Sequence, residues 1–143
     1  MRPTSLKDAA DYIIQGASPL IALNEFLDEF YLSTEHQGMI DEEPGLTGVG
    51  WLDAYLGAVA EHLAGCWGLA VPGWVDDPRR FLDRPYFVEN LQLMKPVLLR
   101  DSPIAFRRRL ILTEAAPLRR ARFPRAEVAS QELQPPEPKK RAT

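Results

Sequence analysis

Residues 51–68, WLDAYLGAVAEHLAGCWG, carry the clearest helical pattern in the chain. Apolar side chains recur every three or four positions across this stretch, which is the spacing of one wide face of an α-helix, and Gly68 is a typical helix end. The small residues Gly57 and Ala58 leave room for a neighbouring helix. We therefore expect a central helix here, with the rest of the chain packed around it.

Two further amphipathic helices are expected before this one. Residues 6–14 repeat the helical spacing after a capping Thr4 or Ser5, and Ser18 with Pro19 is a typical helix start. Residues 33–50 contain four glycines and a run of acidic residues with little periodicity, so we predict a long loop. In the second helix we expect an apolar face and an acidic face, formed respectively by Leu20, Leu23, Leu27, Phe30 and Tyr31 and by Asn24, Glu25, Asp28 and Glu29.

After residue 69, five prolines at positions 72, 78, 85, 96 and 103 divide the chain into short pieces. An acidic residue before Pro78, and Ser102 before Pro103, predict two short capped helices. Residues 110–113, LILT, favour a brief strand or an extended link. From about residue 126 the chain is poor in apolar residues and ends in a basic tract, which predicts disorder.

Composition and length limit the class of protein. The chain has 143 residues, of which 45% are hydrophobic and 26% charged, as in ordinary globular domains. Nothing in it has the pattern of a signal peptide or a membrane span, and the single cysteine, Cys66, excludes an internal disulfide. We predict a cytoplasmic, all-α, compact single domain of four to six helices over residues 1–125, with a disordered basic tail over residues 126–143.

Charge is divided unequally along the chain. Residues 1–90 contain five basic and fifteen acidic residues, whereas residues 91–143 contain twelve basic and five acidic ones. Seven arginines fall within residues 102–125, SPIAFRRRLILTEAAPLRRARFPR. Opposite charges within one small domain indicate internal pairing or two different binding surfaces.

No catalytic, cofactor-binding or metal-binding set stands out. His62 and Cys66 lie four residues apart on the same helix face, as a base and a thiol would, but that face is also a packing stripe. His36 with the acidic residues of 35–43 lacks the ligand spacing of a metal loop. We therefore read both groups as structural or solvated, and we predict a protein that is not an enzyme and carries no cofactor.

Nucleic acid is an alternative partner for the arginines. Guanidinium groups bind phosphates, and the basic tract at 139–141 would add a flexible arm. However, the isoelectric point of about 5.4 is far below that of a typical DNA-binding domain, and no helix-turn-helix pair is visible. A nucleic-acid-binding regulator that uses the arginine-rich C-terminal part is therefore the alternative to a protein-binding function.

The sequence also resembles a family of small, uncharacterised bacterial proteins. The resemblance covers residues 20–121 and rests on FLDEFY, WLDAYLGAVAEHLA, VPGWVDDPRRFLDRPYF and SPIAFRRRLILTEAAPLRRA, of which SPIAFRRR is the most specific. Members of that family are often encoded beside a nucleotidyltransferase-like toxin and are presumed antitoxins. The resemblance thus implies a protein partner, namely the toxin of an adjacent gene, and it brings no catalytic residues.

An antitoxin of this kind has to cover a basic, substrate-binding cleft, which an acidic surface suits. Helical spacing assigns Phe106 to the core and Arg109 to the edge of the core, with Asp76, Asp77 or Asp83 as its expected carboxylate. The same spacing points Arg107 and Arg108 outward. The residues expected to contact a partner are Glu25, Asp28, Glu29, Asp41, Glu42, Glu43, Arg107 and Arg108.

Overall fold

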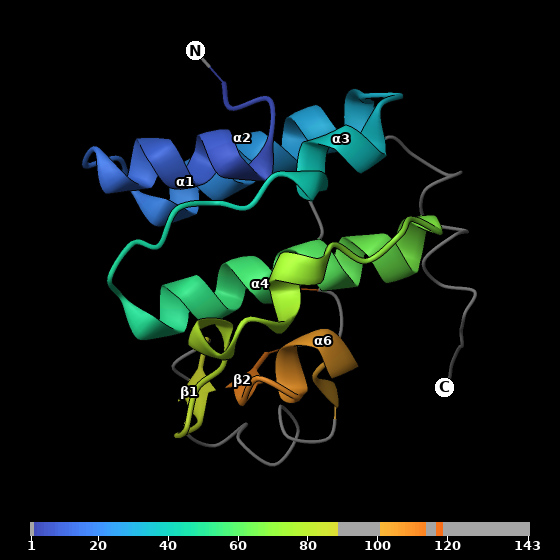
Figure 1. Cartoon of the computed structure of the whole chain (residues 1–143). Helices are drawn as coiled ribbons and strands as arrows, with labels where there is room; N and C mark the ends of the chain where they lie inside the picture. Colours follow the sequence, from blue (N-terminus) through green and yellow to red (C-terminus); the bar gives the residue numbers. More distant parts are fainter. Residues whose placement is uncertain (1, 89–100, 114–116, 119–143) are drawn as a thin grey trace.

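The computed structural model describes residues 2–88, 101–113 and 117–118. The domain is all-α apart from one pair of very short strands, as expected from the sequence (Figure 1). Its helices and strands are α1 (Leu6–Ile14), α2 (Pro19–Leu32), α3 (His36–Asp41), α4 (Gly50–Trp67), the 3₁₀ turns η1 (Gly73–Asp76) and η2 (Pro78–Arg80), β1 (Tyr86–Phe87), α6 (Ile104–Arg107) and β2 (Ile111–Leu112).

The N-terminal helices begin where local chemistry predicts. The Ser5 hydroxyl accepts a hydrogen bond from the Asp8 backbone N–H, and the Ser18 hydroxyl accepts one from that of Ile21. The segment expected to be a long loop instead contains α3. Trp74 fixes this short helix from far along the chain, because its indole N–H donates to the Ile40 carbonyl oxygen at 3.1 Å.

Helix α4 lies between two layers and is the centre of the molecule (Figure 1). Helices α1, α2 and α3 lie on one side of it, and β1, β2 and α6 lie on the other, while η1 and η2 pack against α4. It ends at Gly68, whose backbone adopts the left-handed conformation with φ of 66°, as that glycine predicts. Every other element therefore takes its position relative to this helix.

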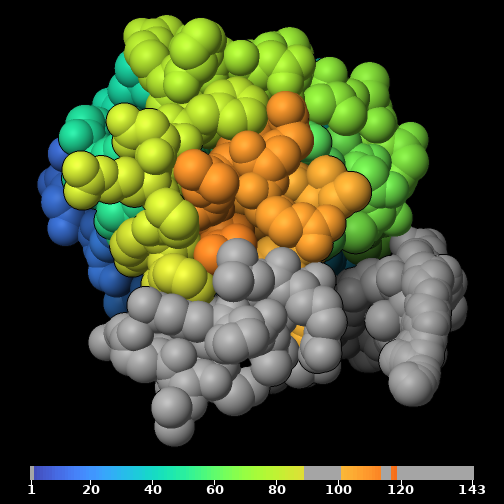
Figure 2. All heavy atoms as spheres, turned by 90° about the horizontal axis from the view of Figure 1, so that it is seen from below, coloured from blue at the N-terminus to red at the C-terminus, as the bar shows by residue number. Residues whose placement is uncertain are grey.

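The C-terminal layer joins two segments of the chain, and Figure 2 shows the yellow residues before 88 beside the orange residues after 101. Strands β1 and β2 pair in parallel with Tyr86 opposite Ile111, which confirms a brief strand within 110–113. It covers Ile111–Leu112 only, because Leu110 before it adopts the left-handed conformation with φ of 65°. Ser102 was expected to cap the following helix, but Pro103 takes that position. The buried Ser102 hydroxyl instead accepts a hydrogen bond from the Thr113 N–H at 2.8 Å and donates one to the Thr113 carbonyl oxygen at 3.0 Å. These two bonds join the start of α6 to the end of β2.

The core confirms part of the predicted helix faces and corrects the rest. Phe106 is fully buried, as expected, and so is Phe30 of α2. Leu20 was assigned to the apolar face of α2 but is 70% exposed, whereas Asp28 was assigned to the acidic face but is only 8% exposed. The reason is that α2 contacts both α1 and α4, so a single stripe does not describe its buried surface. The tail predicted for residues 126–143 lies outside the described residues.

Candidate functional site

Arg109 is one of two fully buried arginines beside α4 among the described residues. Its side chain is 0% exposed, and its Nη1 donates to Glu61 Oε1 at 2.6 Å and to the Ala105 carbonyl oxygen at 2.7 Å. Its Nη2 donates to the Val75 carbonyl oxygen at 2.7 Å. The prediction of a buried, ion-paired Arg109 is therefore confirmed. The predicted partners Asp76, Asp77 and Asp83 are wrong, because the carboxylate comes from Glu61 on α4.

Arg108 forms hydrogen bonds with two carboxylates of the same chain. Its Nε donates to both carboxylate oxygens of Glu61 at 3.0 and 3.1 Å, and its Nη2 donates to Asp76 at 2.7 Å. The guanidinium groups of Arg108 and Arg109 both lie over the Phe81 ring, at 4.9 and 4.6 Å from its centroid. Arg108 is exposed, as expected, but two carboxylates of the same chain already bind it.

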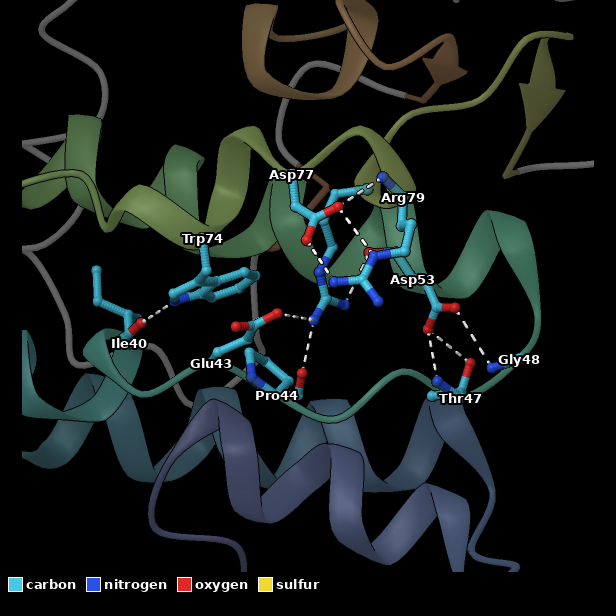
Figure 3. Close-up of polar contacts among 10 residues, drawn as sticks. Ile40, Glu43, Pro44, Thr47, Gly48, Asp53, Trp74, Asp77 and Arg79 are labelled. Atoms are coloured by element: carbon cyan, nitrogen blue, oxygen red, sulfur yellow. Dashed lines mark hydrogen bonds and ion pairs between the residues drawn. The ribbon is translucent and has the colours of Figure 1, made fainter.

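Arg80 is a second buried arginine, and it ties the loop after α3 to α4. Its side chain is 0% exposed, and it donates to the Pro44 carbonyl oxygen at 2.6 Å and to that of Asp53 at 3.3 Å. Glu43 lies 3.6 Å away as its counter-ion, and the Trp74 ring packs on its guanidinium. Figure 3 shows Glu43 and Pro44 of this loop beside Trp74.

The same loop is held a second time by the Asp53 carboxylate. It accepts hydrogen bonds from the Thr47 N–H and hydroxyl at 2.7 and 2.8 Å and from the Gly48 N–H at 3.3 Å (Figure 3). Asp53, Gly57 and Glu61 lie four residues apart and so share one side of α4, which we call the arginine side. This side of α4 therefore holds both the loop between α3 and α4 and the C-terminal layer.

Gly57 is what allows two guanidinium-bearing side chains to approach α4 closely. A Cβ atom at this position would lie 3.1 Å from Arg109 Nε and 3.2 Å from Arg80 Cβ. Within the described residues, the Nε atoms of both arginines have no hydrogen-bond partner. The two arginines therefore use their terminal nitrogens for binding, while their inner ends fill the space over the glycine.

The charges on the arginine side shift one another's pKa values. Burial lowers the pKa of the Arg109 guanidinium, and the Glu61 carboxylate opposes that change. Burial raises the pKa of Glu61, but hydrogen bonds from Arg108 and Arg109 outweigh it, so its pKa lies below the ordinary value. Glu61 is thus held as a carboxylate that is ion-paired with both arginines.

Of the acidic residues predicted to contact a partner, those after α3 are exposed, whereas those of α2 are partly or fully buried. Asp41, Glu42 and Glu43 are exposed and follow one another at the end of α3. Glu29 forms a surface ion pair with Arg2 at 3.4 Å, and Glu25 is only partly exposed. The structure does not bring Asp28 to the surface, since it is buried. Arg107, at the end of α6, is exposed.

His62 and Cys66 do lie together. Cys66 Sγ is 3.6 Å from His62 Nε2, and burial lowers the pKa of the His62 imidazole to about 4. His36 is separate from them, since its Nε2 lies 3.1 Å from the Phe30 carbonyl oxygen. In the described part of the chain, no three or more His, Cys, Asp or Glu side chains gather into a group that could hold a metal. Nor does any described helix have the length and apolarity to cross a membrane.

Sequence reasoning missed Arg80 and Glu61, which complete the arginine side. A signal for them exists in the central helix, where Asp53, Gly57 and Glu61 interrupt an otherwise apolar pattern at four-residue intervals. Two acids flanking a glycine on one side of a buried helix predict close-packed cations. No family model, no curated protein and no solved structure matches the chain.

Proposed function

We propose that the chain is a non-enzymatic protein-binding component of the bacterial cytoplasm, the antitoxin-like half of a toxin–antitoxin pair. In this proposal its acidic segment, residues 35–43, covers a basic surface of a nucleotidyltransferase-like toxin encoded by the adjacent gene. The resemblance of residues 20–121 to a family of presumed antitoxins supplies the kind of partner. The charge arrangement of the domain supplies the binding surface.

The observation that carries the proposal is how the domain uses its basic residues. The described residues include fifteen acidic and eight basic side chains. Acidic side chains are therefore in excess, which suits a basic partner, and at least six of the eight basic ones form ion pairs inside the chain. They are Arg2, Lys7, Arg79, Arg80, Arg108 and Arg109.

The acidic segment is held in place before any partner binds. Met39 and Ile40 of α3 are buried, and the Gln37 amide exchanges hydrogen bonds with the Ala70 backbone at 3.0 and 2.9 Å. Glu35 and Glu42, which lie at the two ends of α3, are exposed and form no ion pair with any described residue. A preorganised surface of one charge lowers the ordering cost of binding and favours a partner of opposite charge.

The nucleic-acid alternative has less support from these contacts. Arg108 and Arg109 already bind carboxylates of the same chain. Arg119, Arg120, Arg122 and Arg125 lie outside the described residues. Binding to nucleic acid would also require an acidic domain to approach phosphates, which electrostatic repulsion opposes.

Co-purification with the product of the neighbouring open reading frame tests the proposal. We expect a complex that weakens at least about tenfold when Asp41 and Glu42 are both replaced by Lys, because reversed charges oppose a basic surface. Asp83→Lys is the matched control, since Asp83 is exposed and lies outside the acidic segment. The proposal is wrong if no complex forms, if both variants bind alike, or if the chain instead binds nucleic acid with a steep salt dependence.

A further inference from the structure

A groove between α2 and α4 lies away from the arginine side, and no residue of the acidic segment lines it. It encloses a cavity of about 230 Å³. The two long walls of the groove are helix faces on which the lining residues recur at helical spacing. They include Leu20, Leu23 and Asn24 of α2 and Trp51, Tyr55 and Val59 of α4.

The groove lies where the packing of α2 on α4 is incomplete. Near the C-terminal ends of the two helices, the rings of Phe30 and Trp67 meet edge-on at 5.6 Å, and Phe30 is fully buried. The cavity lies between the N-terminal halves, where the Leu20 side chain is 70% exposed. The apolar face expected for α2 is thus only partly covered, and its first residue is accessible at the cavity wall.

The α4 wall is aromatic and is fixed from behind. The Trp51 ring stacks on Tyr86 at 4.7 Å with an angle of 9° between the planes, and the Tyr55 ring packs edge-on against Phe106 at 5.4 Å. Both supporting rings belong to the C-terminal layer. An aromatic wall that is already held in place lowers the ordering cost of binding a ligand.

The lining determines which kind of molecule fits. No charged side chain lines the cavity, so an ionic ligand would lose its hydration without gaining a counter-ion. The Asn24 amide and the Tyr55 hydroxyl are polar groups of the lining, and an amide both donates and accepts hydrogen bonds. A cavity of about 150 Å³ lined by apolar side chains holds benzene, so this larger one suits one or two fused rings.

We propose that the groove binds a small, uncharged aromatic molecule of one or two fused rings that carries a hydrogen-bonding group. The ring lies between the leucines of α2 and the aromatic wall of α4, and its polar group bonds the Asn24 amide. Apolar walls with a few polar groups are typical of small-molecule sites, and aromatic pairs gain more than their buried area alone provides. This binding function is separate from the proposed contact with a protein partner.

Calorimetric titration of the full-length chain with indole tests the proposal. We expect one site with a dissociation constant below about 1 mM and a negative heat-capacity change, because apolar surface is buried. Indole-3-carboxylate should bind at least about tenfold more weakly, since no cation lines the cavity. Absence of indole binding, or equal affinity for the two compounds, would overturn the proposal.

Leu20→Ala and Ile21→Ala locate the bound molecule. The two residues are adjacent and are 70% and 58% exposed, but of the two only Leu20 lines the cavity. Both variants should fold, which far-ultraviolet circular dichroism checks. Leu20→Ala should weaken indole binding at least about fivefold through lost apolar contact, and Ile21→Ala should leave it unchanged. Equal affinities of the two variants would place indole elsewhere and contradict the site.

Asn24→Leu tests the polar contact with two ligands of similar shape. Benzothiophene resembles indole but lacks the N–H donor, so it cannot donate a hydrogen bond to the Asn24 amide. Asn24→Leu should weaken the binding of indole relative to that of benzothiophene at least about fivefold. An unchanged ratio of the two affinities would contradict the proposed ligand class.

A second copy of the chain is the competing occupant of the groove. Sedimentation equilibrium, with and without indole, separates the two. We expect the same mass for the unaltered chain and for Leu20→Ala, because the groove binds a small molecule rather than another chain. A dimer that Leu20→Ala dissociates, and that does not bind indole, would refute the proposal.

Discussion

The two sides of α4 are both buried, but they are built by different chemistry. The side that faces α2 carries Val59, Leu63 and Trp67 at four-residue intervals, and Trp67 packs edge-on against Phe30 at 5.6 Å. The arginine side carries Asp53, Gly57 and Glu61 at the same intervals and buries two guanidinium groups. One helix thus joins an apolar layer to a layer held by directed hydrogen bonds.

This difference shows what each side can tolerate. Apolar packing is non-directional, so side chains of similar volume replace one another at low cost. A buried guanidinium that binds three acceptors has no such substitute, because every lost bond leaves a buried polar group unpaired. Mutations should therefore have graded effects on the α2 side and abrupt effects on the arginine side.

The largest effect is expected from Arg109→Ala. The substitution leaves the Ala105 and Val75 carbonyl oxygens without this donor and opens a cavity beside Gly57. We expect the free energy of unfolding to fall by about 3 to 5 kcal/mol, as for other broken buried pairs. Urea unfolding followed by circular dichroism measures the change. A loss below about 1 kcal/mol would mean that these bonds do not hold the C-terminal layer.

The pH dependence of stability should separate His62 from the arginine side. Burial lowers the pKa of folded His62 from 6.5 to about 4, so below pH 6.5 the unfolded chain takes up a proton that the folded chain does not. Stability is therefore fully present above pH 6.5 and is lost as the pH falls toward 4, by on the order of 3 kcal/mol. Glu61 and Cys66 are the titratable groups beside it.

Urea unfolding at a series of pH values measures this loss. His62→Gln should remove it between pH 6.5 and 4. Glu61, whose pKa is lowered by its arginines, contributes stability that is lost only below its ordinary value of 4.5. A variant that retains the full slope above pH 4.5 would assign the proton uptake to another group.

Gly57→Ala should destabilise the domain, although alanine is the better helix former. The added Cβ would meet Arg109 Nε and the Arg80 Cβ atom at 3.1 and 3.2 Å, and overpacking of this kind costs about 1 to 3 kcal/mol. Gly65→Ala in the same helix meets no atom and should stabilise by up to about 1 kcal/mol. Thermal melting of the two variants should therefore shift in opposite directions, and equal shifts would show that Gly57 is not needed for close approach.

The smallest effect on stability is expected from Arg107→Ala. Arg107 is exposed at the end of α6, whereas its neighbour Arg109 is fully buried. Surface substitutions of this kind change the free energy of unfolding by less than about 0.5 kcal/mol. Thermal melting compares the two alanine variants directly. A large loss from Arg107→Ala would mean that the burial assignments of these two arginines are wrong.

Much of the fold could be predicted because its signals are local. The caps at Ser5 and Ser18, the stop at Gly68 and the burial of Phe106 each depend on residues within one or two turns. The partner of Arg109 could not be predicted in this way, because Glu61 lies 48 positions away and is selected by packing.

Helix α3 was missed for a similar reason. Its sequence has weak helical spacing, and its contact with Trp74 spans 34 positions. Asp28 was misplaced because α2 is covered from two directions, which a single helical stripe does not represent. The exposed acids at 41–43 could be predicted from composition alone, since three consecutive acidic residues are costly to bury.

Conservative replacement on each side of α4 tests most directly whether directed bonds hold the arginine side. Arg109→Lys keeps the charge, but a lysine ammonium lacks the planar guanidinium that binds three acceptors at once. Leu63→Met keeps the apolar volume. Urea unfolding should show a loss of at least about 2 kcal/mol for Arg109→Lys and less than about 1.5 kcal/mol for Leu63→Met. Equal losses, or a silent Arg109→Lys, would show that charge or volume alone holds this side and would contradict the geometry described.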